Sequence, residues 1–180
     1  MEEHLFEQTV SSKSVFDGRL LHVHEDVVRM PDGALKTREY IHHNGAACVL
    51  PLTEDNEVYL VHQFRYPFRT VLTEAPAGKV DEGETFLDAA RRELKEETGL
   101  LAEEWTELGI MYTSVAYSDE RIGLFLARGL YQDEQTPDEG EFLTVEKRPL
   151  REVVDLVMNG EICDPKTQLV VLKAARMLGL

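Results

Sequence analysis

The segment from Glu84 to Gly99 has residues that can begin and end a helix, and its apolar residues have the spacing of an amphipathic helix. Thr85 can cap the helix together with Asp88 three residues later, and Gly99 supplies the left-handed residue that commonly ends one. Apolar residues recur at helical spacing and form a single stripe: Leu87, Ala90 and Leu94. A helix with one apolar face has to pack against a core, so this segment constrains any fold that the chain can adopt.

Three glutamates border that apolar stripe, at Glu93, Glu96 and Glu97. On a helix that turns about 100° per residue, they fall within an arc of roughly 100°. Like charges at such spacing repel, which weakens an isolated helix by roughly a few tenths of a kcal/mol per pair. Arg92 lies four residues before Glu96 and can offset part of this repulsion, so a solvated ion-pair face is one interpretation.

The residues before the helix favour a different interpretation. Pro76-Ala77-Gly78 lets the backbone approach other groups closely, and a glycine-containing loop then leads into the helix. Clustered carboxylates beside a backbone carbonyl suit a hard cation such as Mg²⁺, which commonly binds through a few carboxylates, water and a substrate phosphate. The sequence therefore predicts a site that handles phosphate.

The segment resembles the signature of the Nudix hydrolase family at every defined position, namely Gly78, Glu84, Arg92-Glu93-Leu94, Glu96-Glu97 and Gly99-Leu100. The resemblance implies an α+β fold, an α/β/α sandwich with a mixed sheet in which the signature forms a loop-helix-loop. It also implies Mg²⁺ or Mn²⁺ as cofactor. The implied metal ligands are the Ala77 carbonyl, Glu93, Glu96 and Glu97, and the residues implied to hold the motif in shape are Gly78, Glu84 and Arg92.

Outside the signature, Gln63-Phe64-Arg65-Tyr66-Pro67 and Glu74-Ala75-Pro76 look like the ADP-ribose and nucleotide-sugar pyrophosphatase branch. That resemblance implies substrate contacts from Arg65, Glu74 and Glu120. A guanidinium offers paired donors in one plane, so Arg65 can clamp a diphosphate, although an exposed arginine at a strand end is the alternative. Ser114 is followed by Val115-Ala116, where members that prefer ADP-ribose usually carry Pro-Gly, so both substrate classes stay open.

Residues 132–141 form a dense acidic stretch, QDEQTPDEGE, for which a solvated turn is the simplest explanation. In similar pyrophosphatases a loop at this place supplies a catalytic Glu and a further metal ligand two residues apart. We therefore expect Glu139 to be the general base and Glu141 a metal ligand, with Glu134 or Asp138 as alternatives. The residues to which we assign catalytic roles are Glu139, Glu96 and Arg92.

The expected function is metal-dependent hydrolysis of the diphosphate bond of ADP-ribose or a related nucleoside diphosphate sugar. A nucleoside monophosphate and a sugar phosphate would be the products. A non-catalytic sensor with the same fold is the alternative, but such proteins typically lose signature carboxylates that this chain retains. An isomerase with this fold would need a nucleophilic cysteine, and Cys48 and Cys163 are not placed convincingly for that role.

Strands are expected before the helix, with tight reversals at Asp17-Gly18, Pro31-Asp32-Gly33 and Asn44-Gly45. This pattern predicts an antiparallel meander from Val15 to Arg65. Further strands and helices are expected at 106–112, 121–127, 142–147, 150–158 and 165–178. We expect one domain over residues 1–180, with a strand region (1–45) that forms a homodimer and a catalytic core (46–180).

Composition limits the possible binding partners and the cellular compartment of the protein. With 19 Lys and Arg against 34 Asp and Glu, the formal charge of −15 disfavours nucleic acid. Two cysteines, both expected to be buried, indicate a reducing compartment rather than a disulfide framework. The N-terminus does not resemble a secretory signal, and no apolar run approaches the roughly 20 residues of a membrane span. We therefore expect a cytoplasmic protein without a membrane partner.

Overall fold

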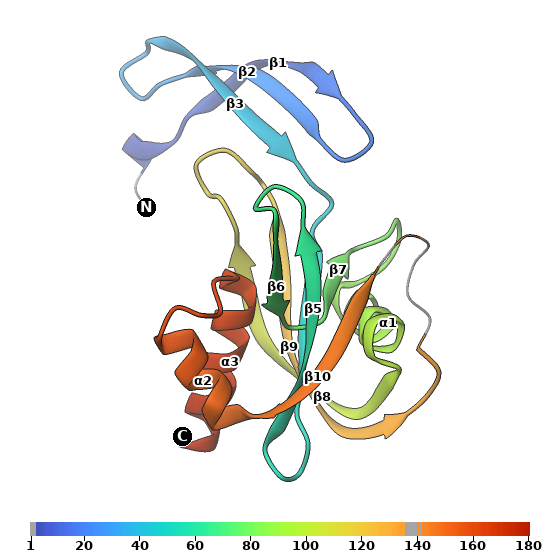
Figure 1. Ribbon diagram of the computed structural model, residues 1–180. Helices are drawn as coiled ribbons and strands as arrows, with labels where there is room; N and C mark the ends of the chain where they lie inside the picture. The colour runs from blue at the N-terminus through green and yellow to red at the C-terminus, as the bar shows by residue number, and fades with distance from the viewer. Residues whose placement is uncertain (1–2, 136–139, 141) are drawn as a thin grey trace. The chain divides into compact units, whose positions relative to one another are not determined.

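The computed structural model describes residues 3–135, 140 and 142–180. They divide into two compact units, one made of residues 1–44 and 112–121 and the other of residues 45–111 and 122–180. Figure 1 labels the helices and strands except η1 and β4. In chain order they are η1 (Glu3–Leu5), β1 (Gln8–Asp17), β2 (His22–Arg29), β3 (Leu35–His42), β4 (Ala46–Pro51), β5 (Glu57–Arg65), β6 (Thr70–Glu74), β7 (Ala77–Lys79), α1 (Phe86–Thr98), β8 (Leu100–Tyr112), β9 (Arg121–Gln132), β10 (Leu143–Pro149), α2 (Leu150–Met158) and α3 (Pro165–Leu178).

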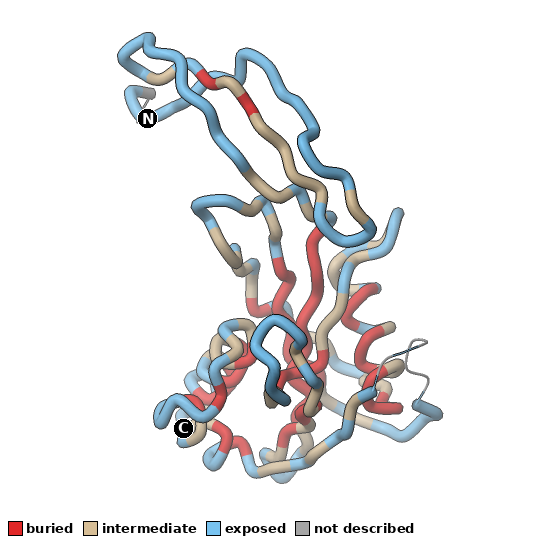
Figure 2. Tube along the Cα trace, turned by 45° about the horizontal axis from the view of Figure 1, so that its top comes forward, coloured by how far each residue is buried: buried red, intermediate tan, exposed pale blue. Residues whose placement is uncertain are grey.

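The first unit contains a three-stranded antiparallel sheet in the order β1-β2-β3. The Gly18 amide donates to the Leu21 carbonyl in the first turn, at 2.9 Å, and Gly33 lies in the second turn with a φ of 87°. The strand β1 is exposed along its whole length, whereas Asp26 and Val28 on the central strand are buried (Figure 2). The predicted antiparallel meander is thus confirmed from β1 to β3.

The second unit contains a mixed sheet and a second, antiparallel one. The first has the order β7-β4-β9-β8, with β4 antiparallel to β7 and parallel to β9, and the second has the order β10-β5-β6. The meander therefore stops at β3, and the expectation that it continues through Asn44-Gly45 into β4 was wrong. Every residue of β4 is buried, and a strand buried on both faces belongs inside a sheet with a parallel neighbour rather than beside an exposed strand.

Side chains of β4 and β9 alternate between two apolar cores, as expected when successive residues of a strand point to opposite faces. One core contains Cys48, Leu50 and Leu124 together with residues of α2 and α3. The other contains Val49 and Phe125 together with residues of α1. All of β4 and residues 122–127 of β9 are buried, and Figure 2 draws buried residues in red. The mixed sheet thus lies between α1 on one face and α2 and α3 on the other, which confirms the expected α/β/α layers.

The helices begin and end where the sequence predicts. Thr85 and Asp88 form a capping box at the start of α1, and Gly99 ends it with a φ of 67°. Asp164 caps α3, whose first residue is Pro165. Among the residues that the structure describes, no helix has both the length and the apolar character needed to cross a membrane.

Two features differ from the expectations. The short strands β6 and β7 were not predicted, because their pairing with β5 and β4 depends on contacts distant in sequence. Cys48 is buried as expected, but Cys163 is exposed. It lies in the turn between α2 and α3, where its thiol reaches the Gly160 carbonyl at 3.3 Å, so the prediction that both cysteines are buried was wrong.

Truncation of Leu94, which is fully buried between α1 and the sheet, should destabilise the protein more than truncation of Leu172, which is 38% exposed on α3. We expect Leu94→Ala to lower the free energy of unfolding by about 2–5 kcal/mol, since it removes apolar contacts and leaves a cavity. Leu172→Ala is the matched control and should cost clearly less. Urea unfolding monitored by circular dichroism measures both, and equal losses would contradict the packing described for α1.

Candidate active site at the start and inner face of helix α1

The inner face of α1 combines core residues with carboxylates. Ala89, Ala90 and Leu94 pack into one of the two cores, while Glu93 and Glu97 are 8% and 3% exposed. Because the sheet covers this face, the two glutamates are partly withdrawn from water. Buried carboxylates require compensating donors, and the surrounding residues supply them.

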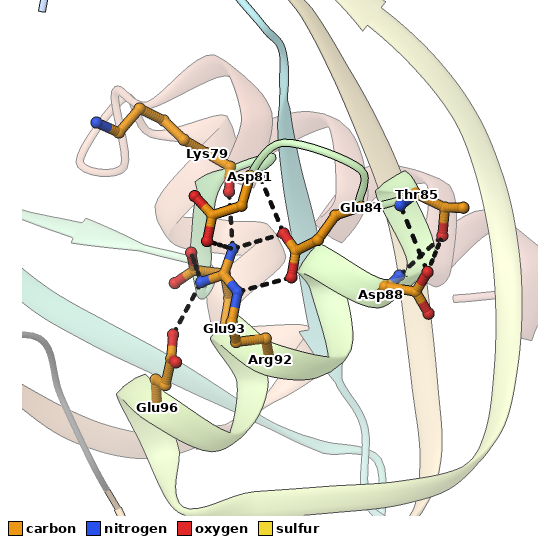
Figure 3. Close-up of polar contacts among 8 residues, drawn as sticks. All are labelled: Lys79, Asp81, Glu84, Thr85, Asp88, Arg92, Glu93 and Glu96. Carbon is orange, nitrogen blue, oxygen red and sulfur yellow. Dashed lines mark hydrogen bonds and ion pairs between the residues drawn. The ribbon is translucent and has the colours of Figure 1, made fainter.

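Arg92 is the centre of the polar contacts on this helix (Figure 3). Its Nε and Nη2 donate to the two carboxylate oxygens of Glu84 at 2.9 and 3.0 Å, and Nη2 also donates to the Lys79 carbonyl at 2.8 Å. Its Nη1 donates to Glu93 at 2.7 Å and to Glu96 at 2.9 Å. One guanidinium thus joins the loop before α1 to two carboxylates on the helix itself.

These contacts change the acidity of the groups involved. The hydrogen bonds from Arg92, followed by the bond from the Asp81 amide, lower the pKa of Glu84 to about 2. The same carboxylates raise the pKa of Arg92 above its ordinary value, with Glu84 as the largest cause. Both groups are therefore charged at neutral pH, and the pair between them is ionic.

The strand β7, which leads into the loop before α1, approaches the carboxylates closely. The Ala77 amide donates to Oε2 of Glu97 at 3.0 Å. A Cβ atom added to Gly78 would lie 1.8 Å from Oε1 of Glu93, far inside any contact distance. Only glycine fits at this position unless Glu93 moves, so the absence of a side chain creates room for the carboxylate against the backbone.

The same residues provide donors for a divalent cation. The carboxylates of Glu93, Glu96 and Glu97 and the Ala77 carbonyl are hard oxygen donors of the kind that Mg²⁺ and Mn²⁺ prefer. Within residues 3–135, 140 and 142–180, no three acidic, histidine or cysteine side chains are gathered in the geometry of a metal site. Because Glu93 and Glu96 accept from Arg92, binding a cation would require them to exchange these bonds, and the donor chemistry of the carboxylates fits that exchange.

Two predicted substrate residues, Arg65 and Glu74, are bonded to each other. Arg65 at the end of β5 donates from Nε and Nη2 to both oxygens of Glu74, at 2.6 and 2.7 Å. Glu74 is 2% exposed, whereas the Arg65 side chain is 39% exposed. Lys166 on α3 also donates to Glu74. Sequence reasoning assigned no role to Lys166, and the available signal was its position immediately after the Asp164-Pro165 start of a helix.

The other predicted residues lie in the first unit or outside the described residues. Glu120 belongs to the first unit, where its Oε1 lies 3.7 Å from Nδ1 of His43. Val115 is in the same unit and is 81% exposed. Glu139 and Glu141 lie outside the described residues, so their assignment as general base and metal ligand stays a prediction.

Cys48 offers no nucleophile for isomerase chemistry. It is fully buried in the sheet, and burial raises the pKa of its thiol far above the usual range. The thiolate is the reactive form of cysteine, so this side chain is inert at neutral pH.

Comparisons with known proteins show which family this chain is similar to. Residues 42–167 match the NUDIX domain, and residues 7–41 match a nucleoside diphosphate sugar hydrolase N-terminal domain. An ADP-ribose pyrophosphatase of Bacillus subtilis (strain 168) is 36% identical over 165 residues, which cover 91% of this chain and 89% of the relative. A methanol dehydrogenase activator of Bacillus methanolicus is 35% identical over 167 residues, which cover 92% of this chain and 90% of the relative.

A solved structure described as an ADP compounds hydrolase has the same fold, with a TM-score of 0.84. The match covers 96% of this chain and 94% of that one at 22% sequence identity.

Replacing Glu84 should remove a contribution to stability that depends on pH. The folded pKa of about 2 lies below the ordinary value of 4.5, so the Glu84–Arg92 pair stabilises the protein above about pH 4.5 and loses this effect as the pH falls towards 2. We expect Glu84→Gln to be less stable than the wild-type protein at pH 7, with the difference shrinking below pH 4.5. Urea unfolding at several pH values measures this, and a difference that does not change with pH would contradict the ionic pairing.

Proposed function

The chain belongs to the NUDIX family, and from this premise we propose that it hydrolyses the diphosphate bond of ADP-ribose or a related nucleoside diphosphate sugar. Water would add across the P–O–P linkage and give a nucleoside monophosphate and a sugar phosphate. The observation that carries the proposal is the complete set of signature carboxylates, arranged around Arg92 and against the backbone of Ala77 and Gly78.

The proposed metal site uses Glu93, Glu96, Glu97 and the Ala77 carbonyl. When bound, Mg²⁺ or Mn²⁺ supplies positive charge to the diphosphate oxygens while the P–O bond breaks. Arg92 would keep Glu93 and Glu96 from being driven apart by their mutual repulsion before the cation arrives. Glu97 would in addition orient the Ala77 peptide through the bond that it already accepts from the amide.

Substrate contacts and the proton acceptor come from outside α1 in this proposal. Arg65 would donate to diphosphate oxygens through the donors that its pair with Glu74 does not use. Glu139 would accept a proton from the attacking water, Glu141 would add a metal ligand, and Glu120 would contact the substrate. The matched nucleotide-sugar hydrolase domain and the ADP-ribose pyrophosphatase relative support both substrate classes, and Val115-Ala116 leaves the preference between them to experiment.

A panel of substrates tests the proposal directly. Purified protein with Mg²⁺ should hydrolyse ADP-ribose, GDP-mannose or ADP-glucose faster than nucleoside triphosphates or diadenosine polyphosphates, as measured by release of phosphatase-sensitive product. Dominant activity on ADP-ribose would show that Val115-Ala116 permits this specificity. Absence of activity across the panel would overturn the proposed hydrolysis and favour the non-catalytic sensor.

Replacing Glu97 by Gln tests the metal assignment. The amide oxygen of Gln can still accept from the Ala77 amide, but the charge that would bind a cation is lost. We expect kcat/KM to fall by about 100-fold or more, because changes even to groups surrounding metal ligands commonly cost 10- to 100-fold. Glu104→Gln, on an exposed position of β8, is the matched control and should retain activity. Near-normal turnover of the folded Glu97→Gln protein would refute the assignment.

We further propose that residues 1–180 act as one functional domain in a cytoplasmic homodimer, with residues 1–45 forming the dimer contact. The edge strand β1 exposes Val10, Val15 and Phe16, which are 50%, 47% and 57% exposed. Exposed apolar residues on an edge strand favour contact with another chain.

The oligomeric state can be measured by gel filtration with light scattering. We expect the mass of a dimer for the wild-type protein and a shift towards the monomer for Val15→Lys, because a charged residue on the edge strand opposes pairing. Thr106→Lys on β8 introduces the same charge at an exposed position of the second unit and should leave the mass unchanged. A monomeric wild-type protein at working concentration would contradict the proposal.

A further inference from the structure

A buried carboxylate at the end of β6 is held by two cations from different parts of the chain. Glu74 accepts two bonds from Arg65, at 2.6 and 2.7 Å, and a further bond from Lys166. The side chains of Glu74 and Lys166 are 2% and 12% exposed, so this ion pair is withdrawn from water. Arg65 comes from β5, whereas Lys166 comes from the first turn of α3, about a hundred residues later.

Lys166 is itself fixed by the start of α3. Its Nζ donates to Asp164 at 2.9 Å, and Asp164 also accepts from the amide and the hydroxyl of Thr167, at 2.9 and 2.5 Å. The Thr167 hydroxyl in turn accepts from the Ala75 amide at 2.7 Å. The first turn of α3 is therefore bonded both to Glu74, the last residue of β6, and to Ala75, which follows it.

The chain leads directly from Glu74 and Ala75 to the proposed metal site. Ala75 is held by Thr167 from α3, and Ala77, two residues later, is held by Glu97 from α1. Consecutive Cα atoms are about 3.8 Å apart, so the cluster around Glu74 lies close to the carboxylates of α1. A substrate diphosphate at those carboxylates would therefore experience the net charge of the cluster.

Four charged groups make up that cluster, and their charges cancel. Arg65 and Lys166 contribute two positive charges, and Glu74 and Asp164 two negative ones. Burial alone would raise the pKa of Glu74, but its bonds with Arg65 and the charge of Lys166 lower it. Burial would lower the pKa of Lys166, but Asp164 and Glu74 raise it. All these contacts keep both residues ionised, and loss of Lys166 would leave one uncompensated negative charge.

We propose that Lys166 is a positioning residue for substrate binding, because it neutralises Glu74 and so leaves the partly exposed side chain of Arg65 able to attract the diphosphate. This inference rests on the proposed function, in which Arg65 contacts the substrate. The two bonds to Glu74 use Nε and Nη2 of Arg65 and not Nη1, and the Arg65 side chain is 39% exposed. Lys166 acts through Glu74 and Arg65 and needs no contact with the substrate itself.

Steady-state kinetics of Lys166→Met test this role on the best substrate of the panel. We expect KM to rise roughly ten-fold, as for one unit charge near a partly buried site, while kcat stays within about three-fold. The increase should be smaller at high salt, which screens the added negative charge. Lys166→Arg keeps the charge and should restore KM to near the wild-type value.

A charge-compensating variant separates electrostatics from packing. Asp164→Asn removes one negative charge, and Asn still caps a helix well. Combined with Lys166→Met it returns the cluster to neutrality, so KM should fall back towards the wild-type value. A purely structural role for Lys166 instead predicts that the double variant binds substrate no better than Lys166→Met.

The single variant Asp164→Asn keeps the test decisive if Lys166→Met proves too unstable to purify. It leaves the cluster with one net positive charge, so KM should drop below that of the wild-type protein. With an active wild-type protein, an unchanged KM in Lys166→Met, or in Asp164→Asn if only that variant can be purified, would overturn the role of Lys166. An inactive wild-type protein across the substrate panel would overturn the proposed function instead.

Discussion

The contacts of Arg92 bring together parts of the site that would otherwise separate. Glu93 and Glu96 lie on one side of α1 and repel each other, and Glu84 lies in the loop before the helix. A single guanidinium reaches all three carboxylates and the Lys79 carbonyl, with distances between 2.7 and 3.0 Å. Because the guanidinium is planar and its donors have fixed directions, it sets the orientation of the loop relative to the helix. The approach of Gly78 to Glu93 depends on this orientation.

The segment from Glu74 to Gly78 is the place where both helical layers meet. Thr167 and Lys166 hold it from α3, and Glu97 holds it from α1 on the other face of the sheet. The Pro76 carbonyl in addition accepts from the Val49 amide of the fully buried β4 at 2.9 Å. A segment bonded in this way to three elements can hold the Ala77 carbonyl in a fixed position and, through Glu74, the Arg65 side chain as well. The proposed chemistry relies on this rigidity, since a misplaced group loses much of its catalytic effect.

Features that depend on neighbouring residues were predicted correctly, whereas strand pairing between residues distant in sequence was not. The caps of α1 and α3 were correctly predicted from Thr85, Asp88, Gly99 and Asp164, because a cap depends on residues within one turn. The meander expected to continue through Asn44-Gly45 stops before β4, because the partners of β4 come from residues 77–79 and 121–132. A turn signal reports local backbone preference and carries no information about such partners.

The sequence by itself determined the helix of the signature, the identity of its carboxylates and the glycine that must stand beside them. These features depend on helical periodicity and on the absence of a side chain, both of which are properties of short segments. Only the tertiary structure decided that Lys166 joins Arg65 on Glu74, that Glu97 accepts from the Ala77 amide, and that Cys163 is exposed. Such contacts arise when strands pair and layers pack across long stretches of chain, and the stability of the whole core selects them rather than any local preference.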